Sequence, residues 1–363
     1  MKTFIIAEIG VNHDGNLEKA KRLIRSAKLS GADAVKFQTF KAEQLVTADS
    51  PKAKYQETST GSGTQFEMLK SLELSYEQFT ELNAFSSSLG IEFMSTPFDI
   101  DSLRFLLSVI KVKRIKLSSG DLTNLPFIYE VGKSKVPAII STGGSTLEEI
   151  DNAVIAWSLG RNEEVPHIRT FKMSETERLA AISSLDLSDL SILQCTTQYP
   201  ASTQNLNLRV ISTYLERYPC KIGFSDHSTG YEAALGAVAL GACIVEKHIT
   251  ESKSDSGPDH SASMEIIDFT SLVESIRLLE TALGGFEKFP TTDELETIQI
   301  ARKSLVAARD IAAGHQIKED DLIILRPLGG FAPSQFWSLI GAIASNDILK
   351  GDFLNESNIS RIS

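Results

Sequence analysis

The chain has few of the features that mark secreted or membrane-spanning proteins. Its 363 residues include three cysteines, Cys195, Cys220 and Cys243, which give no even-numbered disulfide framework and no Cys-x-x-Cys pair. No apolar run approaches the length needed to span a bilayer. The short apolar run at the N-terminus meets Glu8, which predicts a first strand and not a signal peptide. We therefore expect a cytoplasmic protein that makes no membrane contact.

Positive charge is also scarce. The chain carries 36 lysines and arginines against 47 acidic residues, a formal net charge of -11. Because a phosphate backbone is bound by basic surfaces, this balance argues against a nucleic-acid partner. It leaves room for a small phosphorylated substrate, which needs only a local lysine or arginine. With 42% apolar and 23% charged residues, the composition allows one large domain and a smaller one.

Short β-rich runs alternate with helix-period segments over most of the chain, a pattern typical of βαβ units. The runs are 4–7, 34–37, 92–95, 114–117, 137–140, 191–194, 222–224 and 243–246. Eight runs within about 250 residues are what a (β/α)8 barrel requires. An open doubly wound sheet is the alternative, but no GxGxxG turn follows the first run. We therefore predict an α/β fold, a TIM barrel over residues 1–284.

The pattern changes after the barrel. Residues 285–300 are predicted to be a linker, and from Ala301 short strand-like pieces are broken by glycines and acidic turns. These pieces predict a small β-rich domain over 301–363. Between the fifth and sixth runs, residues 161–188 are more than one barrel helix needs, and we expect an extra helix over 175–184.

Two lysines stand at the ends of predicted strands. Because a TIM barrel builds its active site at the C-terminal ends of its strands, Lys36 and Lys116 would lie at the barrel mouth, partly removed from water. Two lysines beside several hydroxyls are suited to a ligand with a phosphate and a carboxylate. Ser95, Ser141 and Thr196 stand at other strand ends, where each is equally consistent with a helix N-cap.

Two histidines end successive predicted strands. The stretch 223–250 predicts a strand, a small-residue helix and a second strand, with His227 and His248 at the two strand ends. Imidazoles from successive strands of a parallel sheet can converge on one metal ion. The alternative is two unrelated histidines, one with a partner inside the core and one exposed to water.

Nine short motifs follow one another along the predicted barrel. They are AEIGVNHDGN (7–16), VKFQTF (35–40), FMSTPFD (93–99), IKLSSGD (115–121), ISTGG (140–144), QCTTQYP (194–200), GFSDHSTG (223–230), VEKHIT (245–250) and GPDHSAS (257–263). In this order, and at barrel strand ends, they resemble the sialic acid synthase family nearly end to end. The C-terminal segment resembles the antifreeze-like (SAF) domain that closes those enzymes.

The resemblance implies a reaction. Family members condense phosphoenolpyruvate with an open-chain N-acyl hexosamine and water, and N-acetylmannosamine is the first expectation for this chain. A related legionaminic-type acid or a 6-phosphorylated hexosamine are alternatives within the family. From another class, the chain could be a catalytically silent carbohydrate-binding or assembly module. A divalent cation is implied, with Mn2+ preferred and Mg2+ or Co2+ as alternatives.

The resemblance also implies roles for individual residues. His227 and His248 match metal ligands. Candidates for moving protons are Glu8, Asp121 and Asp259, although many bacterial members have Glu where Asp121 stands. Substrate contacts are implied for Lys36, Gln38, Lys116, Ser119, Ser141, Thr197, Tyr199 and Arg326. Because the arginine that Arg326 resembles reaches the sugar of the partner subunit, the resemblance implies a homodimer with exchanged C-terminal domains.

Overall fold

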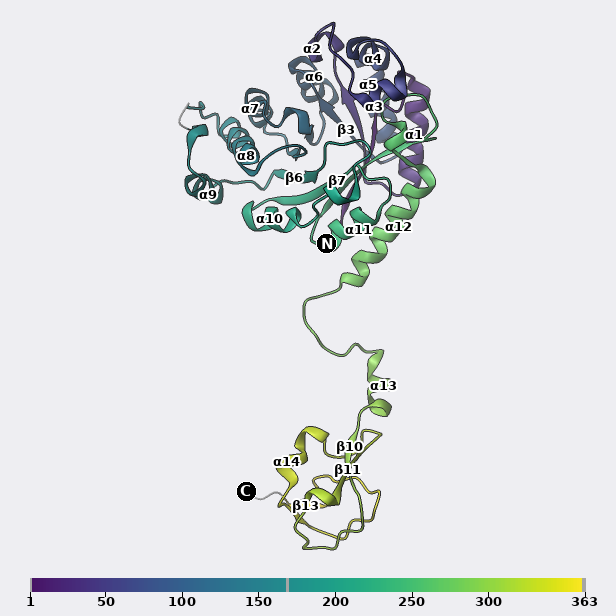
Figure 1. Cartoon of the computed structure of the whole chain (residues 1–363), viewed down its shortest axis with the longest axis vertical. Helices are drawn as coiled ribbons and strands as arrows, with labels where there is room; N and C mark the ends of the chain where they lie inside the picture. Colours follow the sequence, from purple (N-terminus) through teal and green to yellow (C-terminus); the bar gives the residue numbers. More distant parts are fainter. Residues whose placement is uncertain (1, 168–169, 361–363) are drawn as a thin grey trace. The chain divides into compact units, whose positions relative to one another are not determined.

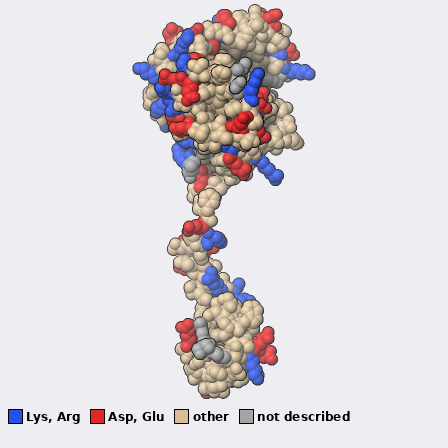
Figure 2. All heavy atoms as spheres, turned by 90° about the vertical axis from the view of Figure 1, so that its left-hand side faces the viewer, with Lys and Arg blue, Asp and Glu red and all other residues tan. Residues whose placement is uncertain are grey.

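The computed structural model describes residues 2–167 and 170–360, so the extra segment and the predicted C-terminal domain are each described in part. The chain divides into two compact units, Met1–Gly284 and Gly285–Ser363, and we describe each by itself (Figure 1). None of the described helices is long and apolar enough to cross a membrane. Acidic and basic side chains are intermixed on the face of the larger unit that Figure 2 shows.

The predicted TIM barrel is confirmed: eight parallel strands alternate with helices. The strands are β1 (Phe4–Gly10), β2 (Ala34–Thr39), β3 (Glu92–Pro97), β4 (Ile115–Leu117), β5 (Ala138–Ser141), β6 (Leu190–Cys195), β7 (Lys221–Asp226) and β8 (Ile244–Thr250). Hydrogen bonds join them in the order β3-β2-β1-β8-β7-β6-β5-β4, which leaves a nearly closed barrel. A short strand, β9 (Met264–Glu265), pairs with β8 outside this order.

Several helices of the first unit begin at a residue whose side chain caps the helix. Ser75, Thr146 and Ser174 each form a capping box with the residue three positions later, so two free backbone N–H groups gain partners. The helices are α1 (Leu17–Leu29), α2 (Ala42–Leu45), α3 (Lys54–Thr60), α4 (Gln65–Leu72), α5 (Tyr76–Ser88), α6 (Ile100–Phe105), α7 (Leu125–Lys133), α8 (Leu147–Arg161), α9 (Glu175–Ser183), α10 (Val210–Arg217), α11 (Glu232–Ala239) and α12 (Ile266–Leu283). Single helical turns lie at Leu106–Ile110, Ser119–Asp121, Thr170–Lys172, Thr203–Asn205 and His260–Ala262.

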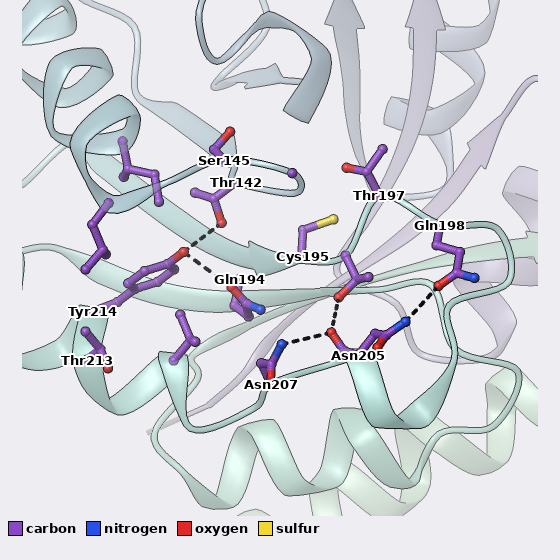
Figure 3. A pocket seen from close by; sticks show the side chains of 15 residues that line it. Thr142, Ser145, Gln194, Cys195, Thr197, Gln198, Asn205, Asn207, Thr213 and Tyr214 are labelled. Atoms are coloured by element: carbon purple, nitrogen blue, oxygen red, sulfur yellow. Dashed lines mark hydrogen bonds between the residues drawn. The ribbon is translucent and has the colours of Figure 1, made fainter.

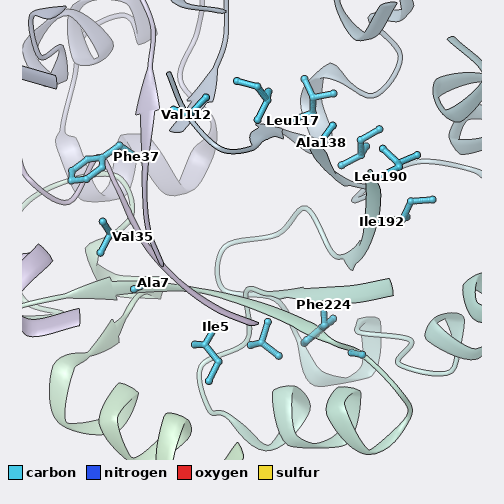
Figure 4. Close-up of a cluster of buried hydrophobic side chains, with 14 of the residues drawn as sticks. Ile5, Ala7, Val35, Phe37, Val112, Leu117, Ala138, Leu190, Ile192 and Phe224 are labelled. Carbon is cyan, nitrogen blue, oxygen red and sulfur yellow. The ribbon is translucent and has the colours of Figure 1, made fainter. Parts of the chain in front are cut away.

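Two apolar layers place the polar groups of the barrel. Outward-facing residues such as Ile5, Ala7 and Phe224 pack in the main core between strands and helices (Figure 4). Inward-facing apolar residues form a separate floor inside the barrel, made by Ile6, Ala34, Met94, Ile139, Leu193 and Ile244. Because strand side chains alternate with a period of two, the next inward position on each of these strands lies one layer above the floor. Those positions are Glu8, Lys36, Thr96, Ser141, Cys195 and Glu246.

The extra helix is observed as α9, and a buried charge network holds it to the barrel. Asp151 of α8 is fully buried and accepts hydrogen bonds from Arg217 Nε at 2.9 Å and from the Tyr218 hydroxyl at 2.9 Å. Arg178 of α9 reaches the same carboxylate at 3.3 Å and also pairs with Glu148. This single aspartate therefore joins α8, α9 and α10.

The second unit is small and β-rich, as predicted. Its elements are α13 (Glu294–Ala301), β10 (Ser304–Ala307), β11 (Leu322–Leu325), α14 (Phe336–Leu339), β12 (Ile343–Ala344) and β13 (Ile359–Ser360), with antiparallel pairs β10–β11 and β12–β13. Part of the segment predicted as a linker is therefore helical. The unit has its own apolar core, and within it the buried Asp321 carboxylate accepts from Arg309 Nε at 2.6 Å and lies 2.8 Å from His315 Nε2.

Candidate active site

Two buried lysines and two buried carboxylates alternate at the inner layer of the barrel. Lys36 Nζ lies 2.8 Å from Glu8 Oε2 and 3.8 Å from Glu246 Oε2, and Lys116 Nζ lies 3.6 Å from Glu246 Oε1. None of the four side chains is more than 5% exposed. Glu246 was not among the site residues predicted from the sequence, although its place two residues before His248 on one strand predicts the same inward face.

Burial and mutual charge set the protonation of this quartet. Burial raises the pKa of Glu8 to about 7, against the opposing effect of Lys36. Burial also opposes the ionised form of Glu246, but Lys116 and Lys36 outweigh it and hold the pKa of that carboxyl below its ordinary value. Burial lowers the pKa of Lys116. Burial also opposes the charged form of Lys36, but Glu246 and Glu8 outweigh burial and raise the pKa of Lys36. Lys36 is therefore the more firmly protonated of the two lysines.

Hydroxyl groups at the ends of β3, β5 and the turn after β4 surround the lysines. Lys36 Nζ donates to Thr96 Oγ1 at 3.1 Å, and Lys116 Nζ donates to Ser141 Oγ at 2.7 Å. Ser119 Oγ accepts from the backbone N–H of Gly143 at 2.9 Å. The structure thus brings four predicted site residues, Lys36, Lys116, Ser119 and Ser141, to the same edge of the barrel.

The loop after β5 approaches the end of β6 too closely for a side chain. A Cβ atom at Gly143 would clash with Thr197 Oγ1 and lie 3.0 Å from both Ser119 Oγ and the Thr197 backbone nitrogen. Glycine at this position lets backbone N–H groups and two hydroxyls converge beside Lys116 and Ser141. Such a convergence of backbone N–H, hydroxyl and lysine donors is suited to an anion.

The two predicted metal-binding histidines lie side by side. Their ring centroids are 5.6 Å apart, and the Tyr199 ring lies 4.2 Å from that of His227 and 5.8 Å from that of His248. His227 Nδ1 donates to the backbone oxygen of Thr196 at 2.8 Å, which fixes the ring. Its Nε2 has only long contacts, 3.5 Å to Ser225 Oγ and 3.9 Å to Cys195 Sγ, and is the more available ligand atom. The sulfur of Cys195, which sequence analysis treated only as a buried apolar group, is 3.7 Å from the same Nδ1.

The donor set around His248 fits a divalent cation. His248 Nδ1 is buried without a hydrogen-bond partner among the described residues, and it lies 3.9 Å from Asp259 Oδ2. Burial, and then the charges of His227 and Lys36, lower the pKa of His248 well below its ordinary value, which keeps the imidazole neutral as metal ligation requires. Two neighbouring imidazoles, one of them with an unsatisfied nitrogen, and a partly buried carboxylate are the ligands expected of a transition-metal site with open positions.

Another cluster of possible ligands does not share this character. Asp14, Asp255 and His260 place one ligand atom each within 4.8 Å of one another. Lys19 Nζ, however, lies 2.6 Å from Asp14 Oδ2 and 2.6 Å from Asp255 Oδ2, while His260 Nδ1 lies 2.7 Å from Thr250 Oγ1. Because the lysine already supplies the cation that the carboxylates need, we interpret this cluster as a structural link among α1, β8 and the loop that follows.

Three further predicted residues differ in whether they contact the quartet. Gln38 Nε2 donates to Glu8 Oε1 at 3.4 Å and so joins the quartet. Asp121 accepts from Ser118 Oγ at 3.0 Å, burial raises its pKa, and the described residues give it no ion pair with Lys116. Arg326 is exposed in the second unit, directly after β11.

Two cavities flank the quartet and the histidines. One, of about 270 Å³, is lined at one end by Gln38, Tyr199, His248 and Asp259. The other, of about 640 Å³, lies among β5, β6, α8 and α10, and its Tyr214 hydroxyl bonds to Thr142 and Gln194 (Figure 3). Although the second is larger, it is lined by neutral groups that bond mainly to one another, so it is less suited to an anionic substrate than the lysine pair.

A TIM barrel with paired lysines and a histidine pair at its mouth has the architecture of an enzyme. The profile of the NeuB family matches residues 23–288, and that of the SAF domain matches residues 302–360. The chain belongs to the NeuB family.

Proteins of similar sequence or structure include named synthases of sugar acids. The N,N'-diacetyllegionaminic acid synthase of Legionella pneumophila is 44% identical over 98% of this chain and 94% of that protein. The N-acetylneuraminate-9-phosphate synthase of Mus musculus is 33% identical over 98% of this chain and 92% of its own. The solved structure of N-acetylneuraminic acid synthetase from Leptospira borgpetersenii in complex with citrate superimposes with a TM-score of 0.66, at 30% identity over 82% of this chain and 90% of that one.

Proposed function

We propose that this enzyme condenses phosphoenolpyruvate with an open-chain N-acyl hexosamine and water, giving a nine-carbon acid and phosphate. The proposal is supported mainly by two groups of side chains that share one barrel mouth. Lys36 and Lys116 form an anion-binding end, and His227 and His248 form an imidazole end. The relatives are named as synthases of nine-carbon acids, which supports the same reaction.

The lysine end would bind phosphoenolpyruvate. The substrate brings a phosphate and a carboxylate into a layer where Glu8 and Glu246 already balance the two lysines. Because Glu8 has a pKa of about 7, it can take up a proton when the anion binds and so release Lys36 to the ligand. Ser119, Ser141 and Thr197 would add hydroxyl donors. Holding the two substrates in line can lower the activation free energy by roughly 7–11 kcal/mol.

The imidazole end would hold the aldehyde of the sugar. His227 and His248, with Asp259 beside them, would bind a divalent cation, Mn2+ in preference to Mg2+ or Co2+. Such a cation supplies Lewis-acid polarisation of a carbonyl oxygen. Tyr199 packs against both rings and would keep them in register.

The reaction requires proton transfers that the carboxylates of the site would carry out. C3 of phosphoenolpyruvate forms a bond to the aldehyde carbon, whose oxygen takes up a proton. Water then adds to C2 and loses one proton, and the C2 hydroxyl loses its remaining proton as the C2–O bond to phosphate breaks and the ketone forms. Three protons therefore move: one to the aldehyde oxygen, one from the attacking water and one from the C2 hydroxyl to the departing phosphate or to solvent. Glu8, whose pKa is about 7, and Asp259, whose pKa burial raises, are placed at the two ends of the site to move the first two. Asp121, at the edge, is the remaining candidate.

The second unit would complete the site of another copy of the chain. Ile323, Leu325, Trp337 and Leu349 all expose apolar side chains on this unit, and Trp337 is 80% exposed. Covering them in a homodimer with exchanged C-terminal domains would remove apolar surface from water and deliver Arg326 to the sugar of the partner. Light scattering on wild type and Trp337→Ser tests the dimer, and a wild-type monomer would contradict it.

With all three cysteines free, we place the enzyme in the reducing cytoplasm.

Phosphate release from phosphoenolpyruvate, with a panel of N-acyl hexosamines and with Mn2+, Mg2+ or Co2+, tests the reaction. We expect release that requires both a sugar and a cation. His248→Ala should abolish turnover and tight Mn2+ binding while leaving the melting temperature close to that of wild type. Release in metal-stripped buffer by that variant would overturn the metal assignment. No release with any sugar would favour a catalytically silent carbohydrate-binding module.

A further inference from the structure

A buried ion pair behind the two histidines joins the ends of β7 and β8. Lys247 Nζ lies 2.9 Å from Asp226 Oδ2, and the two side chains are 1% and 0% exposed. The two residues are partners in the parallel pairing of these strands, and each directly precedes one of the histidines, His248 and His227. Because side chains alternate along a strand, Lys247 faces the helix layer while His248 faces the barrel interior. Neither member of the pair lines the cavity that begins at His248, so the pair does not reach the space proposed for the sugar.

The ammonium group of the pair also closes the turn that follows β7. Lys247 Nζ donates to the backbone oxygen of Ser228 and, at 2.8 Å, to that of Gly230. Together with the bond to Asp226, these contacts use all three hydrogens of the ammonium group. The other oxygen of the same aspartate, Oδ1, accepts from the backbone N–H of Ser228 at 2.8 Å. The chain is therefore fixed to the ion pair immediately before and after His227.

The two histidines differ in how far the sheet itself holds them. His248 lies within β8 and pairs with Glu8 of β1. His227 comes one residue after Asp226, the end of β7, so it lies just beyond the β7–β8 pairing. On the side of the loop after β6, its backbone oxygen accepts from the N–H of Ala201 at 2.8 Å. Because metal–ligand distances are set to within about 0.2 Å, a histidine beyond the end of its strand needs anchors of this kind.

A contribution to stability alone does not account for charges at this position. The preceding outward residues of the two strands, Phe224 and Val245, are apolar and belong to the main core. Replacing a buried ion pair by apolar residues is often neutral or stabilising, because burial of the charges costs free energy. Apolar residues would therefore hold the wall of the barrel equally well, but they could not bond to the carbonyl groups of the turn.

We infer that the Asp226–Lys247 ion pair positions His227 against His248 and so sets the affinity of the proposed metal site. The inference rests on the proposed function, whose metal site the pair supports from the outer face of the barrel. Loss of a group that orients a metal ligand typically costs about 10–100-fold in metal affinity. We expect the Kd for Mn2+ to rise about 10–100-fold in Lys247→Met, which removes all three donors. In Asp226→Asn, which keeps the shape of the side chain, we expect a rise of about ten-fold.

Electron paramagnetic resonance of free Mn2+, titrated with the full chain in the absence of substrate, measures this affinity. Asp151→Asn is the matched control, because Asp151 is also fully buried and ion-paired, and its partners Arg178 and Arg217 lie on helices of the outer layer. The control should lower the melting temperature and leave the Kd for Mn2+ unchanged. Wild-type affinity in Asp226→Asn would overturn the inference and leave the proposed reaction standing. An equal loss of affinity in Asp151→Asn would also overturn it, because general destabilisation would then explain the result.

Phosphate release adds a readout that a structural role would not produce. Because excess cation compensates for weak binding by mass action, saturating Mn2+ should restore most of kcat in Asp226→Asn. The KM of phosphoenolpyruvate, which Lys36 and Lys116 would bind, should stay at its wild-type value. A KM for phosphoenolpyruvate that rises as much as the Kd for Mn2+ would contradict the inference. If wild type itself binds no Mn2+, the proposed metal site is refuted, and the positioning role with it.

Discussion

Gly10 occupies a position where a single methyl group should damage the site more than the fold. It follows Glu8 across an irregularity in the β1–β2 pairing and has φ of 56°, in the left-handed region. A Cβ atom there would lie 3.2 Å from Glu8 Oε1, 3.3 Å from Gln38 Nε2 and 3.5 Å from His248 Cε1. Gly10→Ala therefore pushes on Glu8 and Gln38 and brings a methyl group into contact with His248.

The stability cost of this substitution comes mainly from the backbone. A non-glycine residue in the left-handed region costs about 1–2 kcal/mol, which lowers the melting temperature of a domain of this size by about 2–8 °C. The activity cost has a different origin. Because a displacement of about 1 Å in a catalytic geometry costs about 10²-fold in rate, we expect kcat/KM to fall about 10–100-fold.

Gly90→Ala separates the two effects. Gly90 lies just before the N-terminal end of β3, opposite the C-terminal strand ends that build the site, and has φ of 66°. The nearest atom to its Cβ position is Lys28 Nζ at 3.8 Å. Differential scanning calorimetry should therefore show similar destabilisation in the Gly90 and Gly10 variants, while phosphate release falls only in the latter. Wild-type kcat/KM in Gly10→Ala would refute the reasoning, because the three contacts would then have no catalytic consequence.

Three other predictions follow from buried charges and from the second unit. Asp151→Asn leaves two arginines beside a neutral amide, so urea unfolding should show a loss of about 3–5 kcal/mol; an unchanged midpoint would contradict the network. Hydrogen bonds from Lys318, His315 and Arg309 outweigh burial and hold the pKa of Asp321 below its ordinary value. The ionised carboxylate therefore stabilises the second unit at pH values above the unfolded-state pKa. This stabilisation is lost as the pH falls through the folded-state pKa. Wild type should therefore lose melting temperature between about pH 5 and 2 more steeply than Asp321→Asn, and parallel calorimetric curves would exclude the effect. Arg326→Ala should raise the KM of the sugar without changing that of phosphoenolpyruvate, whereas Arg302→Ala should leave both unchanged; equal changes in the two KM values would argue against a sugar contact.

The local pattern of the sequence predicted the barrel because strand periodicity is a local property. Each of the eight apolar runs falls on an observed strand, and the two-residue alternation separates the apolar floor from the layer above it. Lys36 and Ser141 each follow a floor residue by two positions, so the sequence alone predicts that both side chains point into the barrel. The same alternation extends from Glu246 to His248 on β8.

The partners of these groups came only from the tertiary structure, because they lie far apart in the chain. Glu246 balances Lys36 and Lys116 across strands that are not neighbours in sequence, and closure of the barrel alone brings them within 4 Å. The unsatisfied His248 nitrogen likewise depends on what surrounds it in space.

The cavity that begins at Tyr199, His248 and Asp259 is another feature that the sequence alone does not predict. Residues 41–64 are rich in serine, threonine and glycine, yet they include α2 and α3. Leu45 of α2 packs with α4 against Val11 and Phe98, which follow β1 and β3. Local propensity predicts where a helix begins, but the cavity it closes depends on long-range packing. The sequence by itself determined the barrel and the groups at its mouth; tertiary packing decided their pairing, their protonation and the shape of the space beside them.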